Sequence, residues 1–193
     1  ADSWEDVSLF TRCLTRGLPG AMIPGFYNHN YQILQTPGYV VILVEMIHDA
    51  RIIPLDGRPH LAPQTGQWLG DSRGRWEGDT LVVDTTNFSP KADYTGAGFA
   101  NLRANYFGSG ATLHLIERFT RVDAETIDYQ FTVVDPTNWT KPWTASIPMR
   151  MGGGPTPLYE YACHEGNYGI KNILTGHRAE EQATKGAATS RTN

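Results

Sequence analysis

The stretch MIHDARIIPLDGRPH, at 46–60, gathers side chains that can move protons and hold a ligand. His48 stands beside Asp49, and a neutral imidazole held by a carboxylate is the usual general base of enzymes. Arg51 and His60 follow, and a guanidinium offers a planar pair of donors to a carboxylate or to neighbouring hydroxyls. We expect His48 and Asp49 to be catalytic and Arg51 and His60 to bind ligand. The alternative is a structural turn in which Arg51 forms a salt bridge.

A second pair of proton-carrying side chains, His164 and Glu165, directly follows a predicted strand in YEYACHEGNYG. Neighbouring residues on a strand point to opposite faces, so only one of the two can enter the interior. If His164 turns inward it can meet His48, and we include His164 and Glu165 among the catalytic candidates. The alternative is a solvated polar turn.

The block RGRWEGD, at 73–79, surrounds a tryptophan with charges and glycines. One interpretation is a closing motif in which Trp76 seals one end of the fold and the charges lock it. The other makes Trp76 the wall of a ligand pocket with Arg75 and Asp79 at its polar rim. We favour the closing motif and retain Arg75, Trp76 and Asp79 as ligand-binding candidates.

Motifs that would identify a reaction are missing from the sequence. It contains no GxSxG, GxGxxG, phosphate-binding loop, HExxH, CxxC or EF-hand pattern. Of the six histidines, His48, His60 and His164 form the most suggestive cluster for a metal, but their spacing matches no metal motif. We therefore assign no metal ligands, and the cofactor stays open.

Composition indicates one globular domain, which we place at 1–181 with a flexible tail at 182–193. The chain has 193 residues, 40% of them hydrophobic, and a formal net charge of −4. Its basic residues are scattered, which argues against nucleic acid as a partner. The longest apolar run, at 39–47, is interrupted by Glu45 and is far shorter than the roughly 20 residues that cross a bilayer. We expect no transmembrane segment.

Alternation of apolar and polar residues predicts an all-β fold with seven to nine strands. The pattern is clearest at 112–135, where two alternating runs flank VDAET, and at 31–47, where Thr-Pro-Gly separates two runs. Local connections favour an antiparallel barrel of calycin-like character, or a related sandwich. Short helices are expected at both ends, the first over 2–17, and the glycine-rich stretch 96–111 is a candidate lid.

Cys13 and Cys163 are the two cysteines of the chain. In an exported protein such a pair can form a disulfide, and the other interpretation is two buried thiols. The disulfide would close a long loop, which the chain-entropy model values at roughly 5 kcal/mol.

Four blocks, IIPLDGRPH, WLGDSRGRWEGDTLVVDTTNF, ERFTRVDAETIDYQFTVVD and YEYACHEGNYG, resemble a large family of uncharacterised exported bacterial proteins. The resemblance extends from about Leu9 to Glu181. Members of that family look longer, with a signal peptide, so it implies a processed chain and a periplasmic or extracellular location. It implies no activity.

Together these features favour an exported small-molecule-handling protein. Its ligand would be a sugar-derived or aromatic compound, with His/Asp acid–base chemistry as one activity. Two alternatives remain: a structural subunit that assembles into homo-oligomers or larger complexes, and a His-ligated metalloenzyme. The sequence does not decide whether the protein is an enzyme.

Overall fold

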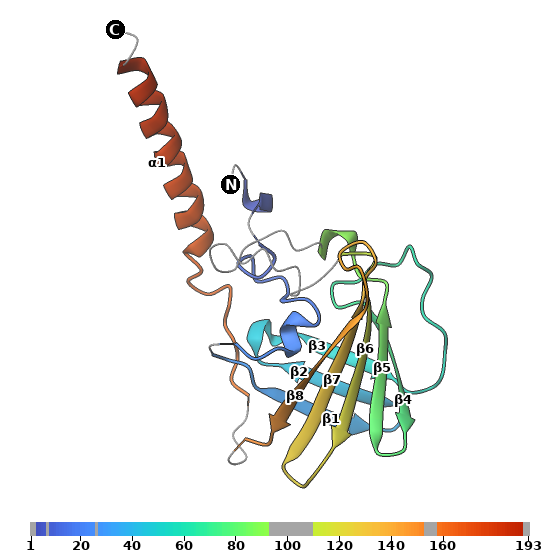
Figure 1. The fold of residues 1–193 in the computed structure, drawn as a ribbon. Coiled ribbons are helices and arrows are strands. Elements are labelled where there is room, and N and C mark those ends of the chain that lie inside the picture. The colour runs from blue at the N-terminus through green and yellow to red at the C-terminus, as the bar shows by residue number, and fades with distance from the viewer. Residues whose placement is uncertain (1–2, 7, 26, 93–109, 153–157, 191–193) are drawn as a thin grey trace.

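The computed structural model describes residues 3–6, 8–25, 27–92, 110–152 and 158–190. In these residues eight strands form two antiparallel sheets (Figure 1). The three-stranded sheet consists, in order, of β1 (Tyr31–Thr36), β2 (Tyr39–Val44) and β3 (Ala50–Pro54). The five-stranded sheet consists of β4 (Asp71–Glu77), β5 (Thr80–Thr86), β6 (His114–Arg121), β7 (Thr126–Val134) and β8 (Trp143–Arg150).

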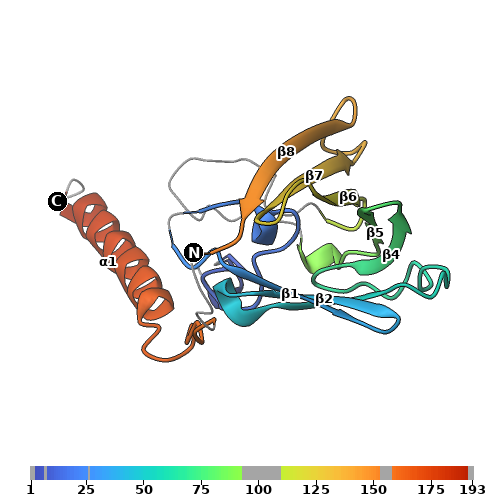
Figure 2. The same ribbon diagram turned by 90° about the horizontal axis from the view of Figure 1, so that it is seen from below.

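Short helical turns accompany the strands in the described parts of the chain. These are η1 (Trp4–Asp6), η2 (Gly20–Met22), η3 (Met46–His48) and η4 (Pro90–Ala92). A single α-helix, α1 (Gly169–Ser190), follows the last strand and projects away from the sheets in both views (Figures 1 and 2). None of the described helices is long and apolar enough to cross a membrane.

Tight turns determine the register of the hairpins. Pro37 and Gly38 connect β1 to β2, and Gly38 has a φ of +80°, which glycine adopts without steric cost. Gly78 has a φ of +59° in the turn between β4 and β5. These turns place the apolar phase of each strand on the face between the two sheets.

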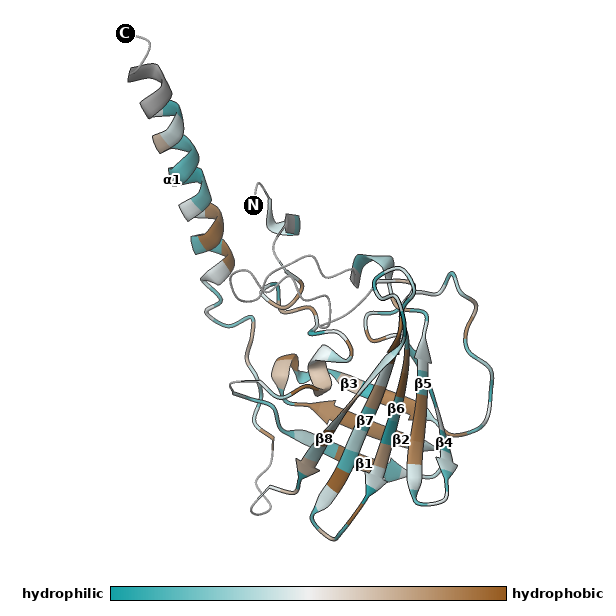
Figure 3. Cartoon of the chain, viewed as in Figure 1, coloured by the Kyte–Doolittle hydropathy of each residue, from teal (hydrophilic) through white to brown (hydrophobic). Residues whose placement is uncertain are grey.

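The core lies between the sheets, whose strands run across one another (Figure 1). Hydrophobic residues concentrate on the strands, whereas most of α1 is hydrophilic (Figure 3). The inner strands β2, β5, β6 and β7 carry many of the buried side chains. These include Val40, Ile42, Val44, Leu115, Phe119, Tyr129, Phe131 and Val133.

A buried ion pair joins the two sheets. Arg51 of β3 donates from both terminal nitrogens to the carboxylate of Glu117 on β6, with a distance of 3.0 Å between Nη1 and Oε1. These side chains are 1% and 0% exposed. The Tyr129 hydroxyl donates to Glu117 Oε1 at 2.8 Å, and burial together with the Glu117 carboxylate raises the pKa of Tyr129 well above its ordinary range. The phenol therefore keeps its proton and acts as a donor at neutral pH.

The two sheets are close on one side and open on the other. Where β3 faces β4, a Cβ on Gly74 would come within 2.6 Å of Leu55 and 2.8 Å of Ile53. On the opposite side β1 pairs only with β2 and β8 only with β7, and the sheets diverge toward β8 (Figure 2). The all-β prediction is confirmed and the architecture is sandwich-like, because the edge strands do not pair to close a barrel.

Both terminal helices differ from the expectation. The helix predicted at 2–17 is reduced to η1 and a series of turns, in which Cys13 has a φ of +58°. At the other end α1 has 22 residues and is longer than predicted. It includes residues 182–190, which were predicted to belong to a flexible tail. The candidate lid at 96–111 lies almost wholly outside the described residues.

Of the two interpretations of the cysteine pair, the structure has the disulfide: Cys13 and Cys163 are bonded, with Cα atoms 5.7 Å apart. It ties the turns before η2 to the segment that leads into α1. Asn167 reinforces this junction by donating to the Thr11 carbonyl at 3.0 Å.

We predict that Glu117→Gln lowers the free energy of unfolding by about 3 to 5 kcal/mol, because it leaves the buried Arg51 cation without a countercharge. Urea unfolding at neutral pH measures this loss. The control is Glu77→Gln, which removes a carboxylate from the exposed pairs with Arg75 and Arg118 and should leave the midpoint almost unchanged. Equal midpoints for the two variants would contradict the prediction.

Candidate functional site

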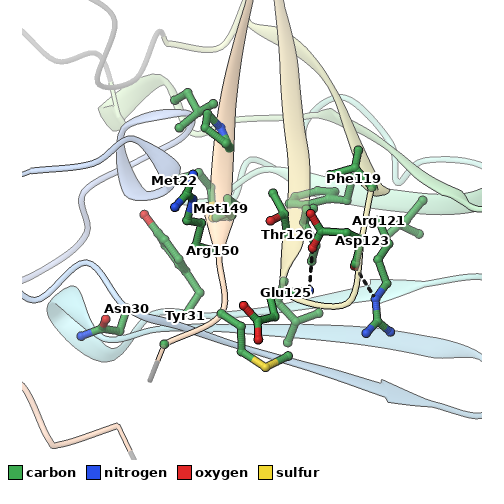
Figure 4. A pocket seen from close by; sticks show the side chains of 18 of the residues that line it. Met22, Asn30, Tyr31, Phe119, Arg121, Asp123, Glu125, Thr126, Met149 and Arg150 are labelled. Atoms are coloured by element: carbon green, nitrogen blue, oxygen red, sulfur yellow. Dashed lines mark hydrogen bonds between the residues drawn. The ribbon is translucent and has the colours of Figure 1, made fainter. Parts of the chain in front are cut away.

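A cleft of about 1470 Å³ opens between the two sheets on the side of β1 and β8. One wall is the inward face of β1 and β2, with Tyr31, Ile33, Gln35 and Val40. The other wall comes from the five-stranded sheet and includes Trp76, Leu81, Phe119, Ile127, Ile147 and Met149. Figure 4 shows that residues from both sheets border the same space.

The cleft exists because the outermost strands are only half covered. Three inward side chains of β7, those of Tyr129, Phe131 and Val133, are at most 2% exposed. The inward residues of neighbouring β8, Ile147 and Met149 among them, are only partly buried. Tyr31 and Ile33 of β1 show the same partial burial across the cleft. Apolar surface that would complete the core of a closed barrel is thus left accessible.

Charged residues of the β6–β7 turn form one rim (Figure 4). The Asp123 carboxylate accepts the backbone N–H of Glu125 at 2.7 Å, which lowers the pKa of Asp123. Arg121 donates from Nε to the Asp123 carbonyl at 3.0 Å. Arg150 of β8 also lines the cleft. This mouth therefore carries both signs of charge, while the interior is apolar.

Tyr31 supplies a polar group inside the apolar part of the cleft. Its hydroxyl is buried and has no hydrogen-bond partner among the described residues. Burial raises the pKa of Tyr31 to about 12, so at neutral pH the hydroxyl keeps its proton. Buried polar groups are nearly always hydrogen-bonded. A ligand atom that accepts a hydrogen bond would satisfy this one.

A polar cluster lies at the β1 end of the cleft. The buried Glu45 carboxylate accepts from Asn30 Nδ2 at 2.7 Å and from Asn28 Nδ2 at 3.2 Å. The ring of His29 contacts the Arg16 guanidinium, with 3.1 Å between Nη1 and Nδ1. Burial, followed by the positive charge of Arg16, lowers the pKa of His29 to about 4. His29 is therefore a neutral imidazole at physiological pH.

The RGRWEGD block reaches the cleft in part. Trp76 and Asp79 line it, and 47% of Trp76 is exposed, so the indole borders an open space. Arg75 does not line the cleft and instead donates to Glu77 at 2.7 Å on the protein surface. Two of the three residues of the pocket interpretation thus border the cleft, and their contact with a ligand stays a prediction.

His60 is held between two carboxylates on the outer face of the five-stranded sheet. Its Nδ1 lies 3.1 Å from Asp71 Oδ2 and its Nε2 lies 3.0 Å from Asp84 Oδ1. His114 Nε2 lies 3.0 Å from the second oxygen of Asp84. His60 can donate to both carboxylates at once only as the imidazolium. These contacts fasten the segment before β4 to the sheet.

Arg51 is used inside the protein, since the pair with Glu117 occupies both of its terminal nitrogens. The salt bridge foreseen in the structural interpretation of 46–60 is therefore present, with Glu117 as partner. Contact of Arg51 or His60 with a ligand stays a prediction.

Hydrogen bonds and ion pairs do not link the four catalytic candidates to one another in the described structure. His48 is exposed in η3, and both His164 and Glu165 are exposed in the turn after Cys163. No hydrogen bond or ion pair joins His48 to His164, although the structure describes both residues. Asp49 accepts the Thr15 hydroxyl at 2.9 Å, and burial raises its pKa.

The backbone before Asp49 is unusual. Ile47 and His48 have φ values of +61° and +47°, a region that β-branched residues rarely adopt. Such strain often accompanies functional sites. This backbone geometry and the raised pKa of Asp49 are the features of this segment that favour the predicted acid–base role.

Several cleft residues are absent from the sequence-based candidates, notably Tyr31, Phe119 and Met149. All three lie on the inward phase of a predicted strand, which identifies them as core residues but not as residues beside an opening. In the described part of the chain no group of three or more His, Cys, Asp or Glu residues is arranged to hold a metal ion.

Comparison of the chain with family models, with curated proteins and with solved structures finds no match. The resemblance to exported bacterial proteins therefore stays a prediction, and the cleft has to be interpreted from its own chemistry.

We predict that His29 makes the protein less stable as the pH falls from about 6.5 to about 4. The unfolded chain takes up the proton near pH 6.5, whereas the folded protein resists it until about pH 4, so acid favours unfolding in this window. Denaturant unfolding of the wild type and of His29→Gln at a series of pH values measures the effect. The difference between their unfolding free energies as a function of pH gives the contribution of His29. Identical pH dependence of the two proteins, or an NMR titration of His29 near 6.5, would refute it.

Proposed function

We propose that the protein binds a small apolar or aromatic molecule in the cleft between its two sheets. The observation that supports this most directly is the accessible inward surface of β1 and β8, where side chains that would otherwise belong to the core border an open space. Ligand sites are typically concave, largely apolar and furnished with a few polar groups.

The side chains of the cleft suit a planar ligand. Trp76 and Phe119 offer aromatic faces, and Ile147 and Met149 offer flexible apolar contacts on the same sheet. The Tyr31 hydroxyl can donate to one acceptor of the ligand. Because the cleft exceeds the roughly 300–1,000 Å³ of common ligand pockets, it leaves room for water beside a small molecule.

The same proposal includes a location outside the cytoplasm. A disulfide that ties the two ends of the described chain persists in oxidising compartments such as the periplasm or the extracellular space. Of the calycin-like prediction, this proposal keeps one part. The ligand lies between antiparallel sheets, and it enters from the open side of the sandwich.

We predict that Trp76→Ala weakens binding of the fluorescent probe 1-anilinonaphthalene-8-sulfonate about tenfold, because burial of an aromatic ring contributes at least about 1.4 kcal/mol. A fluorescence titration gives the dissociation constants. The matched control is Trp68→Ala, since Trp68 is similarly exposed, at 37% against 47%, but lies outside this cleft. Equal effects of the two substitutions would show that the probe binds elsewhere.

Acid–base catalysis is the second candidate function, supported by the strained Ile47–His48 backbone and by the raised pKa of Asp49. We predict that His48→Ala and His164→Ala abolish turnover of a sugar-derived or aromatic substrate while probe binding in the cleft stays unchanged. Steady-state kinetics and the fluorescence titration measure the two properties separately. Full turnover in both variants would exclude these histidines as catalytic residues.

A further inference from the structure

The outer edge of β1 carries unpaired backbone groups. In a two-residue hairpin the pair that flanks the turn, here Thr36 and Tyr39, is hydrogen-bonded, and bonded pairs recur at every second residue. The bond from Glu45 N to Asn30 O, at 3.0 Å, agrees with this pattern, in which the even-numbered residues of β1 bond to β2. The N–H and C=O groups of Tyr31, Ile33 and Gln35 therefore point away from β2.

No other described segment satisfies these groups, because no backbone hydrogen bond from the described residues reaches them. The β1 edge also lacks the charged residues and prolines that usually protect an exposed edge strand from pairing. The β1 sequence YQILQT contains neither a charge nor a proline, and Leu34 on its outer face is 45% exposed. Edges of this kind readily accept another strand.

The remaining sheet edges differ from β1. At β8, the bond from Met151 N to Glu125 O, at 2.7 Å, shows that even-numbered residues face outward. Pro148 is one of them, so it interrupts the ladder of donors, and Arg150 adds a charge. On β3 the outward-facing residues include Pro54, which has no N–H, and on β4 the outward-facing Ser72 carbonyl accepts from Arg73 Nη1 at 2.8 Å. In the described structure β1 is thus the one uninterrupted edge.

The free groups of β1 are arranged symmetrically. Ile33 lies midway between Tyr31 and Gln35, so a two-fold axis through Ile33 places each outward-facing residue opposite an outward-facing residue of a second β1. Antiparallel pairing then satisfies both partners of every pair. Since the strand is uncharged, no like charges oppose one another across the axis. The edge is complementary to itself.

We propose that β1 is a dimerisation strand, which pairs antiparallel with β1 of a second copy of this chain to form a continuous six-stranded sheet. Such an isologous contact closes after two subunits and leaves no further free edge of this kind. The two-fold axis brings the open sides of both clefts toward each other. Pairing requires only the strand edge and is independent of a ligand in the cleft.

Light scattering coupled to size-exclusion chromatography, over a wide range of protein concentrations, tests the proposal. Gln35→Pro removes one outward N–H donor and leaves the β1–β2 ladder intact, because proline is tolerated where the N–H faces away from the sheet. Gln35→Ala is the control, since it shortens the same exposed side chain and keeps the donor. We expect wild type and Gln35→Ala to approach twice the mass of one chain as concentration rises, and Gln35→Pro to stay at the mass of one chain.

Two results would overturn the proposal: a wild-type protein that keeps the mass of one chain at every concentration, or a Gln35→Pro variant that associates as the Gln35→Ala variant does. Circular dichroism and thermal unfolding establish that both variants are folded. Titration with 1-anilinonaphthalene-8-sulfonate separates this proposal from the ligand-binding one. Dimers that do not bind the probe contradict only ligand binding, and monomers that bind it contradict only the dimer.

Discussion

A guanidinium enclosed between two sheets is the constraint on which the rest of the structure depends. Arg51 comes from the three-stranded sheet and Glu117 from the five-stranded sheet, so each buried charge finds its countercharge only across the interface between the sheets. A buried charge without its partner costs several kcal/mol. The ion pair therefore favours an arrangement of the two sheets that keeps Arg51 against Glu117.

The open side of the sandwich follows from that arrangement. Close contact at Gly74 brings β3 and β4 together, and the ion pair extends from β3 to β6. Beyond β6 the five-stranded sheet continues through β7 to β8, while the opposite sheet ends at β1. The unequal number of strands leaves the inward faces of β1 and β8 half covered. The cleft and the free β1 edge are two consequences of this one asymmetry.

Local features of the sequence predict the elements well. The hairpin around VDAET and the Pro37-Gly38 turn appear as expected, because alternation and turn chemistry act within a few residues. Closure of a barrel depends on whether β1 and β8 pair across more than a hundred residues, and neither strand's own pattern contains that information. Glu117 shows the same limit, since its place on an apolar phase marks it as buried but does not identify Arg51 as its partner.

The candidate site was predictable only where the residue type itself is distinctive. Trp76 and Asp79 line the cleft, whereas Arg75, the other rim residue of the pocket interpretation of RGRWEGD, does not. His60 is bound by Asp71 and Asp84, and no spacing in the sequence indicates that pairing. His48 and His164 were linked through an assumed inward turn, whereas both are exposed on separate segments.

The central claim is that one ligand contacts both walls of the inter-sheet cleft. Methyl NMR of isoleucine-labelled protein during titration with 1-anilinonaphthalene-8-sulfonate tests it most directly. Ile33 on β1 and Ile147 on β8 should shift together with a single dissociation constant, while Ile52, 64% exposed and outside the cleft, should not move. Shifts confined to Ile52, or no shift at Ile33 and Ile147 under saturating probe, would contradict the account.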